Sequence, residues 1–266
     1  RALAAGDLHT RVGGPKRRWA DEVSVLSNDF DRMAERIQAL ITGKETLLRD
    51  VSHELRSPLA RIRMALALAQ RRANDEAQPD LERIERDAER LDDLIGQIMN
   101  LSRLRTQQAP RREPLSFDAL VQTVVDDARY EYPEATVKLE SAGPCEVLAD
   151  RVGLRSAVDN VIRNALHYAG DAGPIEVTIE ATAEQIVLRV ADCGPGVSED
   201  DLTRIFEPLY RVDPSRDHRG VGRGISGQGI GLAITARVME LHDGRAVARN
   251  RAGGGLEVTL RLPAGL

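Results

Sequence analysis

The chain has 266 residues, which suggests about two domains, and its 42% hydrophobic and 30% charged content is typical of a soluble protein with a sizeable core. A net charge of −5 argues against general nucleic-acid binding. Cys145 and Cys193 form neither a metal-spaced motif nor a disulfide scaffold, which fits a reducing cytoplasm. The sequence has no apolar run of about 18 residues and no signal peptide. Because it begins at Arg1 and not at a methionine, we expect a piece of a longer protein.

The N-terminal part of the chain predicts a connector followed by a long helix. Residues 1–20 are polar and contain Gly13 and Pro15, so we expect a loop there. A helix is expected to begin at Asp21 and Glu22, whose charges favour a helix N-terminus. Its apolar residues recur at alternating steps of four and three, as in a coiled coil: Leu26, Phe30, Met33, Ile37 and Leu40.

The same helix is expected to continue through residues 50–62, which contain His53 followed by Glu54. The apolar seam leaves His53 at an outward position; it consists of Leu48, Val51, Leu55, Pro58, Ile62, Ala65 and Ala69. An exposed neutral imidazole is a nucleophile near pH 7, and the adjacent carboxylate can accept a proton. On this segment alone, an ordinary surface histidine beside a surface glutamate is an equal alternative.

Two irregularities are expected around His53. The steps from Leu47 to Val51 and from Val51 to Leu55 are both four residues, which makes a stutter unless the additional leucine there only widens the apolar face. Pro58 removes a backbone hydrogen bond, so we expect a bend just after His53.

A second helix is expected after a turn at residues 74–79. Its apolar seam includes Leu81, Ile84, Ala88, Leu91, Ile95 and Ile98. Two such helices form a hairpin with a thin core, so a dimeric four-helix bundle is expected. Residues 109–114 are expected to form a linker.

From residue 115 the pattern predicts a layered α/β domain with a mostly antiparallel sheet. Helices are expected at 116–131, 151–169 and 229–242. Strands are expected at 136–140, 145–149, 174–181, 185–191, 246–250 and 256–262. Residues 207–228 carry many glycines and charges with little periodicity, which indicates a functional lid or disorder.

Two polar motifs in this domain could contact a ligand. Asn160 and Asn164 are four residues apart on one helix face, and their amides can bind a hard cation or a phosphate. Asp192 follows a strand and precedes Gly194 and Gly196, which would let a ligand approach closely. Taken alone, the first motif could be a solvent-exposed polar pair and the second an ordinary turn.

A third motif, Gly227, Gly229, Gly231 and Leu232, precedes an expected helix. Free N–H groups at a helix N-terminus suit phosphates. The spacing matches neither the P-loop nor the dinucleotide fingerprint, and a plain helix-start turn is the alternative.

In their order along the chain, these motifs resemble those of bacterial sensor histidine kinases, most closely the envelope-stress Cpx type. The H, N, G1, F and G2 boxes of that family correspond to residues 50–62, 159–168, 192–196, 206–211 and 227–232. Residues 253–263 resemble the family's final glycine-bearing strand pair, and residues 6–43 resemble the second half of a HAMP relay module.

The resemblance implies three parts: a HAMP-like linker with a coiled-coil helix at 1–44, a dimerisation and phosphotransfer hairpin at 45–108, and a Bergerat-type α/β sandwich ATPase domain at 115–266. It implies an ATP-dependent protein-histidine kinase that phosphorylates His53 and passes the phosphoryl group to an aspartate of a response regulator. The expected partners are a second copy of the chain and a receiver domain, without nucleic acid. The expected location is the cytoplasmic side of an inner membrane, held there only through segments outside this chain.

The resemblance also assigns roles to individual residues. Asp192 would accept a hydrogen bond from the adenine amine, Asn164 would bind Mg²⁺ with Asn160 nearby, and Arg211 would lie near the γ-phosphate. The full implied ATP site is Asn160, Asn164, His167, Tyr168, Asp192, Gly194, Gly196, Arg211, Gly227, Gly229, Gly231 and Leu232.

Three further expectations concern catalysis and regulation. His53 would attack the γ-phosphorus with Glu54 as base, and Ser57 would support dephosphorylation of the regulator, although a surface serine is the alternative. His167 stands where relatives carry Lys or Arg, so ATP affinity should fall as pH rises through the imidazole pKa. A histidine without a contact is the alternative.

Two other classes of protein remain as rivals. One is another Bergerat ATPase, such as a chaperone or topoisomerase subunit, but those lack an exposed His-Glu pair on a preceding helix. The other is a dimeric scaffold that binds ATP without transferring its phosphate.

Overall fold

The structure is a computed structural model that describes residues 21–71, 77–106, 110–169, 172–212 and 229–264. The expectations for residues 1–20, for Gly227 and for most of the segment 207–228 therefore lie outside the described residues. The chain divides into two compact units, residues 1–95 and 96–266. None of the described helices is long and apolar enough to cross a membrane.

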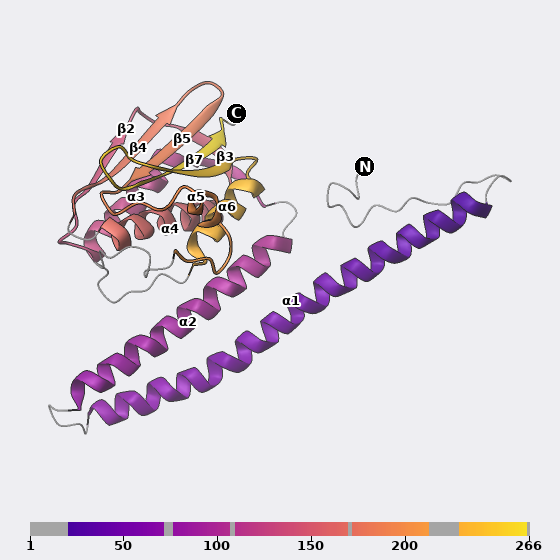
Figure 1. The fold of residues 1–266 in the computed structure, drawn as a ribbon, viewed down its shortest axis with the longest axis horizontal. Helices are drawn as coiled ribbons and strands as arrows, with labels where there is room; N and C mark the ends of the chain where they lie inside the picture. Colours follow the sequence, from indigo (N-terminus) through magenta and orange to yellow (C-terminus); the bar gives the residue numbers. More distant parts are fainter. Residues whose placement is uncertain (1–20, 72–76, 107–109, 170–171, 213–228, 265–266) are drawn as a thin grey trace. The chain divides into compact units, whose positions relative to one another are not determined.

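The first unit contains the long helix α1, Asp21–Gln70, and the start of α2, Gln78–Thr106. The helix begins at the predicted residue and continues without interruption through the interior proline, Pro58 (Figure 1). The two helices run antiparallel, because contacts from later residues of α1 reach earlier residues of α2. These contacts are Arg56 to Asp92 at 3.8 Å, Arg63 to Glu89 at 3.8 Å, and Gln70 to Glu85 at 2.8 Å. The predicted hairpin is confirmed.

The packing face of this hairpin differs from the predicted seam. Leu59 and Leu66 of α1 are buried, at 6% exposure each, whereas the predicted seam residues Leu55 and Ile62 are 48% and 49% exposed. In a single hairpin α1 meets only one neighbouring helix, so only one stripe of its apolar surface can be covered. Val51, another residue of the predicted seam, is 43% exposed in the single chain.

The second unit contains the end of α2 and an α/β domain. Its further elements are β1 Glu113–Ser116, α3 Phe117–Glu131, β2 Val137–Ser141, β3 Glu146–Ala149, α4 Arg151–Ala169, β4 Ile175–Ala181, β5 Gln185–Ala191, α5 Asp201–Arg204, α6 Gly231–Leu241, β6 Arg245–Asn250 and β7 Leu256–Pro263. All the helices and strands predicted for this domain are present, within a few residues of their predicted bounds.

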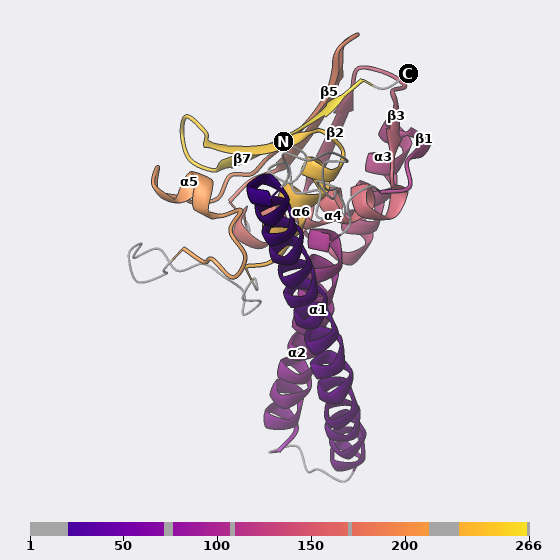
Figure 2. The same cartoon turned by 90° about the vertical axis from the view of Figure 1, so that its right-hand side faces the viewer.

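The strands form a five-stranded sheet in the order β2-β4-β5-β7-β6 and a separate ladder of β1 with β3. The pairing is antiparallel except between β2 and β4, as the predicted mostly antiparallel sheet requires. Helices α3, α4 and α6 lie on the same side of the large sheet (Figures 1 and 2). A hydrophobic core joins these helices to the alternate, inward-facing residues of the strands, such as Ile186, Leu188 and Val190 of β5.

Two short elements were missed by the sequence prediction. The prediction of a linker over residues 109–114 is wrong at its C-terminal end. Glu113 and Pro114 belong to β1 and pair with Ala149 and Leu148 of β3. Proline argues against a strand, but it is tolerated in this two-stranded ladder, where each strand is an edge. The other is α5, whose single turn is too short to show a helical period.

Candidate functional site

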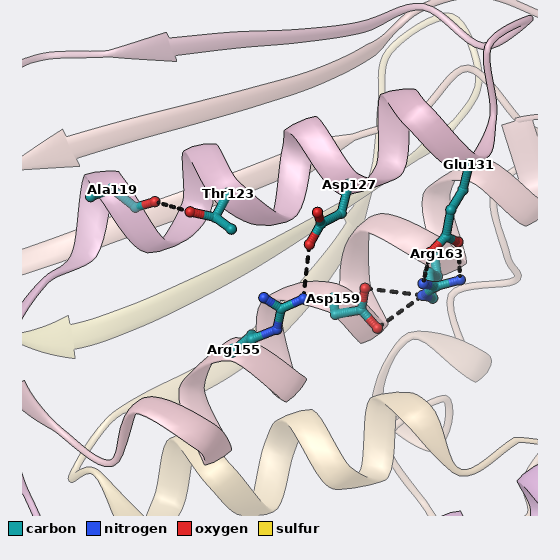
Figure 3. Close-up of polar contacts among 7 residues, drawn as sticks. All are labelled: Ala119, Thr123, Asp127, Glu131, Arg155, Asp159 and Arg163. Carbon is teal, nitrogen blue, oxygen red and sulfur yellow. Dashed lines mark hydrogen bonds and ion pairs between the residues drawn. The ribbon is translucent and has the colours of Figure 1, made fainter.

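Helix α4 carries two asparagines, and a row of ion pairs on its outer side holds it against α3. Arg155 contacts Asp127 at 2.8 Å, and Arg163 contacts both Glu131 and Asp159 at 2.8–2.9 Å (Figure 3). These side chains are partly exposed, so each pair contributes little energy, on the order of 1 kcal/mol or less. Their regular spacing along α4 nevertheless favours one rotational setting of the helix.

Asn160 and Asn164 lie half-buried on α4. Helix α6 passes close to Asn160: a Cβ added to Gly231 would lie 3.2 Å from its Oδ1 atom. The Asn160 amide nitrogen Nδ2 is buried and has no hydrogen-bond partner among the described residues. An unpaired buried donor costs about 1–3 kcal/mol. This amide is therefore available to a polar ligand at the junction of α4 and α6.

Asp192 directly follows β5 and is 3% exposed. Its Oδ1 atom accepts hydrogen bonds from the backbone N–H groups of Gly194 at 2.8 Å and Leu256 at 3.1 Å. Burial raises the pKa of this carboxyl group above its ordinary value, although the two N–H groups and the nearby Arg251 act in the opposite direction. Since Oδ1 already accepts two bonds, Oδ2 is the oxygen left for a ligand.

The loop after Asp192 closes against the end of α4. A Cβ at Gly194 would lie 2.6 Å from the carbonyl oxygen of Tyr168, so only glycine fits there. A Cβ at Gly196 would lie 2.7 Å from Oδ1 of Asn250. The Asn250 side chain accepts the N–H of Val197 and donates to the carbonyl of the same residue. Glycine is thus needed at both positions because other protein atoms lie close to them. The sequence prediction had explained these glycines by the close approach of a ligand.

The described part of the glycine motif, residues 229–232, turns tightly into α6. Gly229 has a φ of 69°, and its carbonyl accepts the N–H of Leu209 at 2.8 Å. Helix α6 begins at Gly231 without a side-chain cap at its N-terminus. Its first N–H groups therefore have no capping side chain, which is suited to an anion. Leu232 packs against the hydrophobic core.

His167 and Arg211 lie near each other, although they are far apart in the sequence. Burial lowers the pKa of the His167 imidazole, and the positive charge of Arg211 lowers it further. The His167 ring meets the ring of Tyr168 edge-on, with 4.7 Å between centroids. Both effects favour the neutral form of the His167 imidazole.

The predicted catalytic residues belong to the other unit, on α1. The backbone of His53 is helical, but its side chain lies outside the described part of the structure. Glu54 is exposed, and the hydroxyl oxygen of Ser57 accepts a hydrogen bond from Arg61 at 2.8 Å. Arg61 was not singled out from the sequence, because an arginine one turn further along an exposed helix gives no distinctive signal.

The second unit thus brings most of the predicted nucleotide residues onto α4, the loop after β5 and the start of α6. Two family models match the chain. One, described as "His Kinase A (phospho-acceptor) domain", matches residues 43–107, and the other, described as "Histidine kinase-, DNA gyrase B-, and HSP90-like ATPase", matches residues 149–266. A phospho-acceptor domain followed by such an ATPase domain defines the histidine kinase class.

Similarity to individual proteins narrows the class, and the chain belongs to the sensor histidine kinases. It is 35% identical over 237 residues to the sensor histidine kinase CpxA of Escherichia coli K12, covering 88% of this chain and 50% of CpxA. It is 30% identical over 264 residues to BaeS of the same strain, covering 98% of this chain and 55% of BaeS. The chain spans about half the length of these curated relatives.

Solved structures support the fold. ShkA, crystallised in full length in complex with AMPPNP, superposes with a TM-score of 0.68 at 24% identity over 83% of this chain and 46% of ShkA. The Acinetobacter baumannii histidine kinase AdeS gives a TM-score of 0.55 at 21% identity over 80% of this chain and 98% of that one. The predicted fold class, helical phosphotransfer region followed by an α/β ATPase domain, is confirmed.

Proposed function

We propose that the chain is the kinase portion of a sensor histidine kinase that uses ATP to phosphorylate His53 and then transfers the phosphoryl group to an aspartate of a response regulator. The observation that carries this proposal is the buried, unpaired amide of Asn160 beside the uncapped start of α6. It leaves a donor for a phosphate-bearing ligand within the matched ATPase domain.

We assign the roles at the nucleotide as follows. Oδ2 of Asp192 accepts a hydrogen bond from the adenine amine, while Asn160 and the N–H groups that begin α6 donate to the phosphates. Asn164 offers an amide oxygen to Mg²⁺, which would neutralise phosphate charge when bound. Arg211 offsets the charge that develops on the γ-phosphate. The remaining contacts are assigned to His167, Tyr168, Gly194, Gly196, Gly227, Gly229, Gly231 and Leu232.

In the transfer step, a ring nitrogen of His53 forms a bond to the γ-phosphorus as the bond to the bridging oxygen breaks and ADP leaves. Glu54 accepts the ring proton. We also propose a phosphatase activity in which Ser57, one turn further along α1, helps to orient the attacking water. Arg61 holds the Ser57 hydroxyl through the 2.8 Å hydrogen bond and so fixes its direction.

We infer that the working unit is a homodimer in which the hairpin, residues 45–108, forms a four-helix bundle. The exposed apolar side chains of the hairpin support this inference, among them Leu55, Ile62 and Leu91. Residues 115–266 form the ATP-binding domain in this scheme. The residues before 45 form a HAMP-like connector to an inner membrane, with the kinase on the cytoplasmic side, as in a Cpx-type kinase.

The proposal is tested by incubating the protein with γ-labelled ATP and Mg²⁺, with a His53→Ala variant as control. We expect protein-bound label that is stable in base, labile in acid and absent from the variant. ATP hydrolysis without protein labelling would instead identify an ATPase of the gyrase or chaperone kind. Nucleotide binding without hydrolysis or labelling would identify a signalling scaffold.

A further inference from the structure

Arg251 lies in the turn between β6 and β7 and reaches the loop that carries Asp192. Its Nη1 atom donates to the main-chain carbonyl oxygen of Asp192 at 3.0 Å and lies 3.8 Å from the sulfur of Cys193. Its Nη2 atom donates to the Glu176 carboxylate on β4 at 2.8 Å. The guanidinium therefore ties the end of β5 to a neighbouring strand and to the β6–β7 turn.

The backbone of the same turn closes on Asp192 from the other direction. Leu256 donates its N–H to Oδ1 of Asp192 and accepts the N–H of Asp192 at 2.9 Å. A Cβ at Gly255 would lie 2.0 Å from the Asp192 carbonyl oxygen, so the turn can approach this closely only with glycine there. Arg251 thus holds the main-chain carbonyl of Asp192, and Leu256 holds its main-chain N–H.

Arg251 also affects the ionisation of the Asp192 carboxyl group through its charge. The carboxyl group is almost fully buried, and burial opposes its ionisation. The backbone N–H groups of Gly194 and Leu256 and the cation of Arg251 favour the ionised form. Glu176 faces the guanidinium from β4 and compensates part of its charge. The ionised carboxylate offers acceptors at both of its oxygens, whereas the protonated form carries a hydrogen-bond donor on one of them.

We propose that Arg251 is a positioning residue for base recognition: it fixes the main chain of Asp192 so that the carboxylate points at the exocyclic amine of a purine. The inference rests on the proposed function only in taking Asp192 as the group that contacts the base. Arg251 itself does not touch the nucleotide. Its loss should therefore weaken binding of a base with an amine more than binding of a base without one.

The first test compares the affinities of ATP and ITP, whose 6-oxo group cannot donate to a carboxylate, by calorimetry on Arg251→Gln, Arg251→Lys and Arg249→Gln. Arg249 is the matched control, because it forms a similar ion pair with Glu257 at 2.8 Å and has no contact with Asp192 among the described residues. For Arg251→Gln we expect about a tenfold loss for ATP and a much smaller loss for ITP. Arg251→Lys should recover part of the preference, and Arg249→Gln should behave as wild type.

The second test needs no nucleotide and so separates this inference from the kinase proposal. The Asp192 carboxyl carbon is titrated by NMR in the free protein, where Arg251→Gln should move its pKa further upward and Arg249→Gln should not. Equal losses for ATP and ITP, or an unmoved Asp192 titration, would overturn the positioning role. If Arg251→Gln unfolds at the assay temperature, an unchanged ATP-to-ITP preference in Arg251→Lys would also overturn it. If only the His53 labelling experiment failed, the kinase proposal would be wrong, but the ATP-to-ITP comparison and the Asp192 titration would still test the role of Arg251.

Discussion

At the scale of single residues, two buried polar groups differ in how far the protein itself satisfies them. Oδ1 of Asp192 accepts two backbone N–H groups, whereas the Asn160 amide nitrogen has no partner among the described residues. The carboxylate is thus held in one direction before any ligand binds, and the amide is left with a donor to offer. Such an unsatisfied group lowers stability and is retained where binding requires it.

We therefore expect Asn160→Leu to stabilise the nucleotide-free protein while weakening ATP binding. Leucine has a similar shape and removes the unpaired donor, which should raise the free energy of unfolding by about 1 kcal/mol. Urea unfolding and calorimetric ATP titration measure the two effects on the same sample. A loss of stability together with unchanged ATP affinity would contradict this role. Gln122→Leu, on the exposed side of α3, serves as the surface control.

His167 gives a prediction about pH. Its pKa is lowered from 6.5 by burial and then by the charge of Arg211, so the protonated form exists only in mildly acidic solution. The protonated ring attracts phosphates, and this attraction is lost as pH rises through the pKa. ATP affinity should therefore decrease with rising pH below 6.5, and His167→Gln should remove that slope. Flat ATP affinity in wild type from about pH 5.5 to 8 would exclude a phosphate contact.

At the scale of helices and strands, periodicity in the sequence predicted the type and bounds of single elements. It did not predict features that depend on contacts between distant parts of the chain. Helix α4 has the bounds that its apolar spacing indicated, because about five turns of regular burial leave little ambiguity. The parallel pairing of β2 with β4 was not predicted, since register between distant strands leaves no local trace. The Asn160 and Asn164 pair was found by spacing, but the contact of Arg251 with Asp192 joins residues 59 positions apart.

Pro58 gives the prediction at this scale. It lies inside α1, four residues after Glu54, whose carbonyl therefore lacks its usual N–H partner. Pro58→Ala restores that bond and should straighten the helix near His53. We expect the ratio of kinase to phosphatase activity to change while ATP affinity stays the same. Rates of labelling and of regulator dephosphorylation measure the ratio, and an unaltered ratio would count against control through local bending.

At the scale of the whole molecule, the two units place different requirements on assembly. The α/β unit has a continuous core of its own, whereas the described side chains of the hairpin unit include few buried apolar residues and many exposed ones. A two-helix hairpin cannot cover all of this apolar surface by itself, and the proposed second copy of the chain would cover the rest.

The last prediction follows from this difference. Replacing both Leu55 and Ile62, each about half exposed, with glutamate should convert the dimer to a monomer, because four charges would face each other across the bundle. Sedimentation equilibrium measures the change in mass. The control is Val152→Glu, at a residue that is 69% exposed on α4 in the other unit, and it should leave the dimer intact. ATP affinity should be the same in all three proteins, because the residues proposed to bind the nucleotide all belong to the α/β unit. A variant that remains dimeric would place the subunit contact elsewhere, and a variant that also loses ATP binding would contradict the independence of the two units.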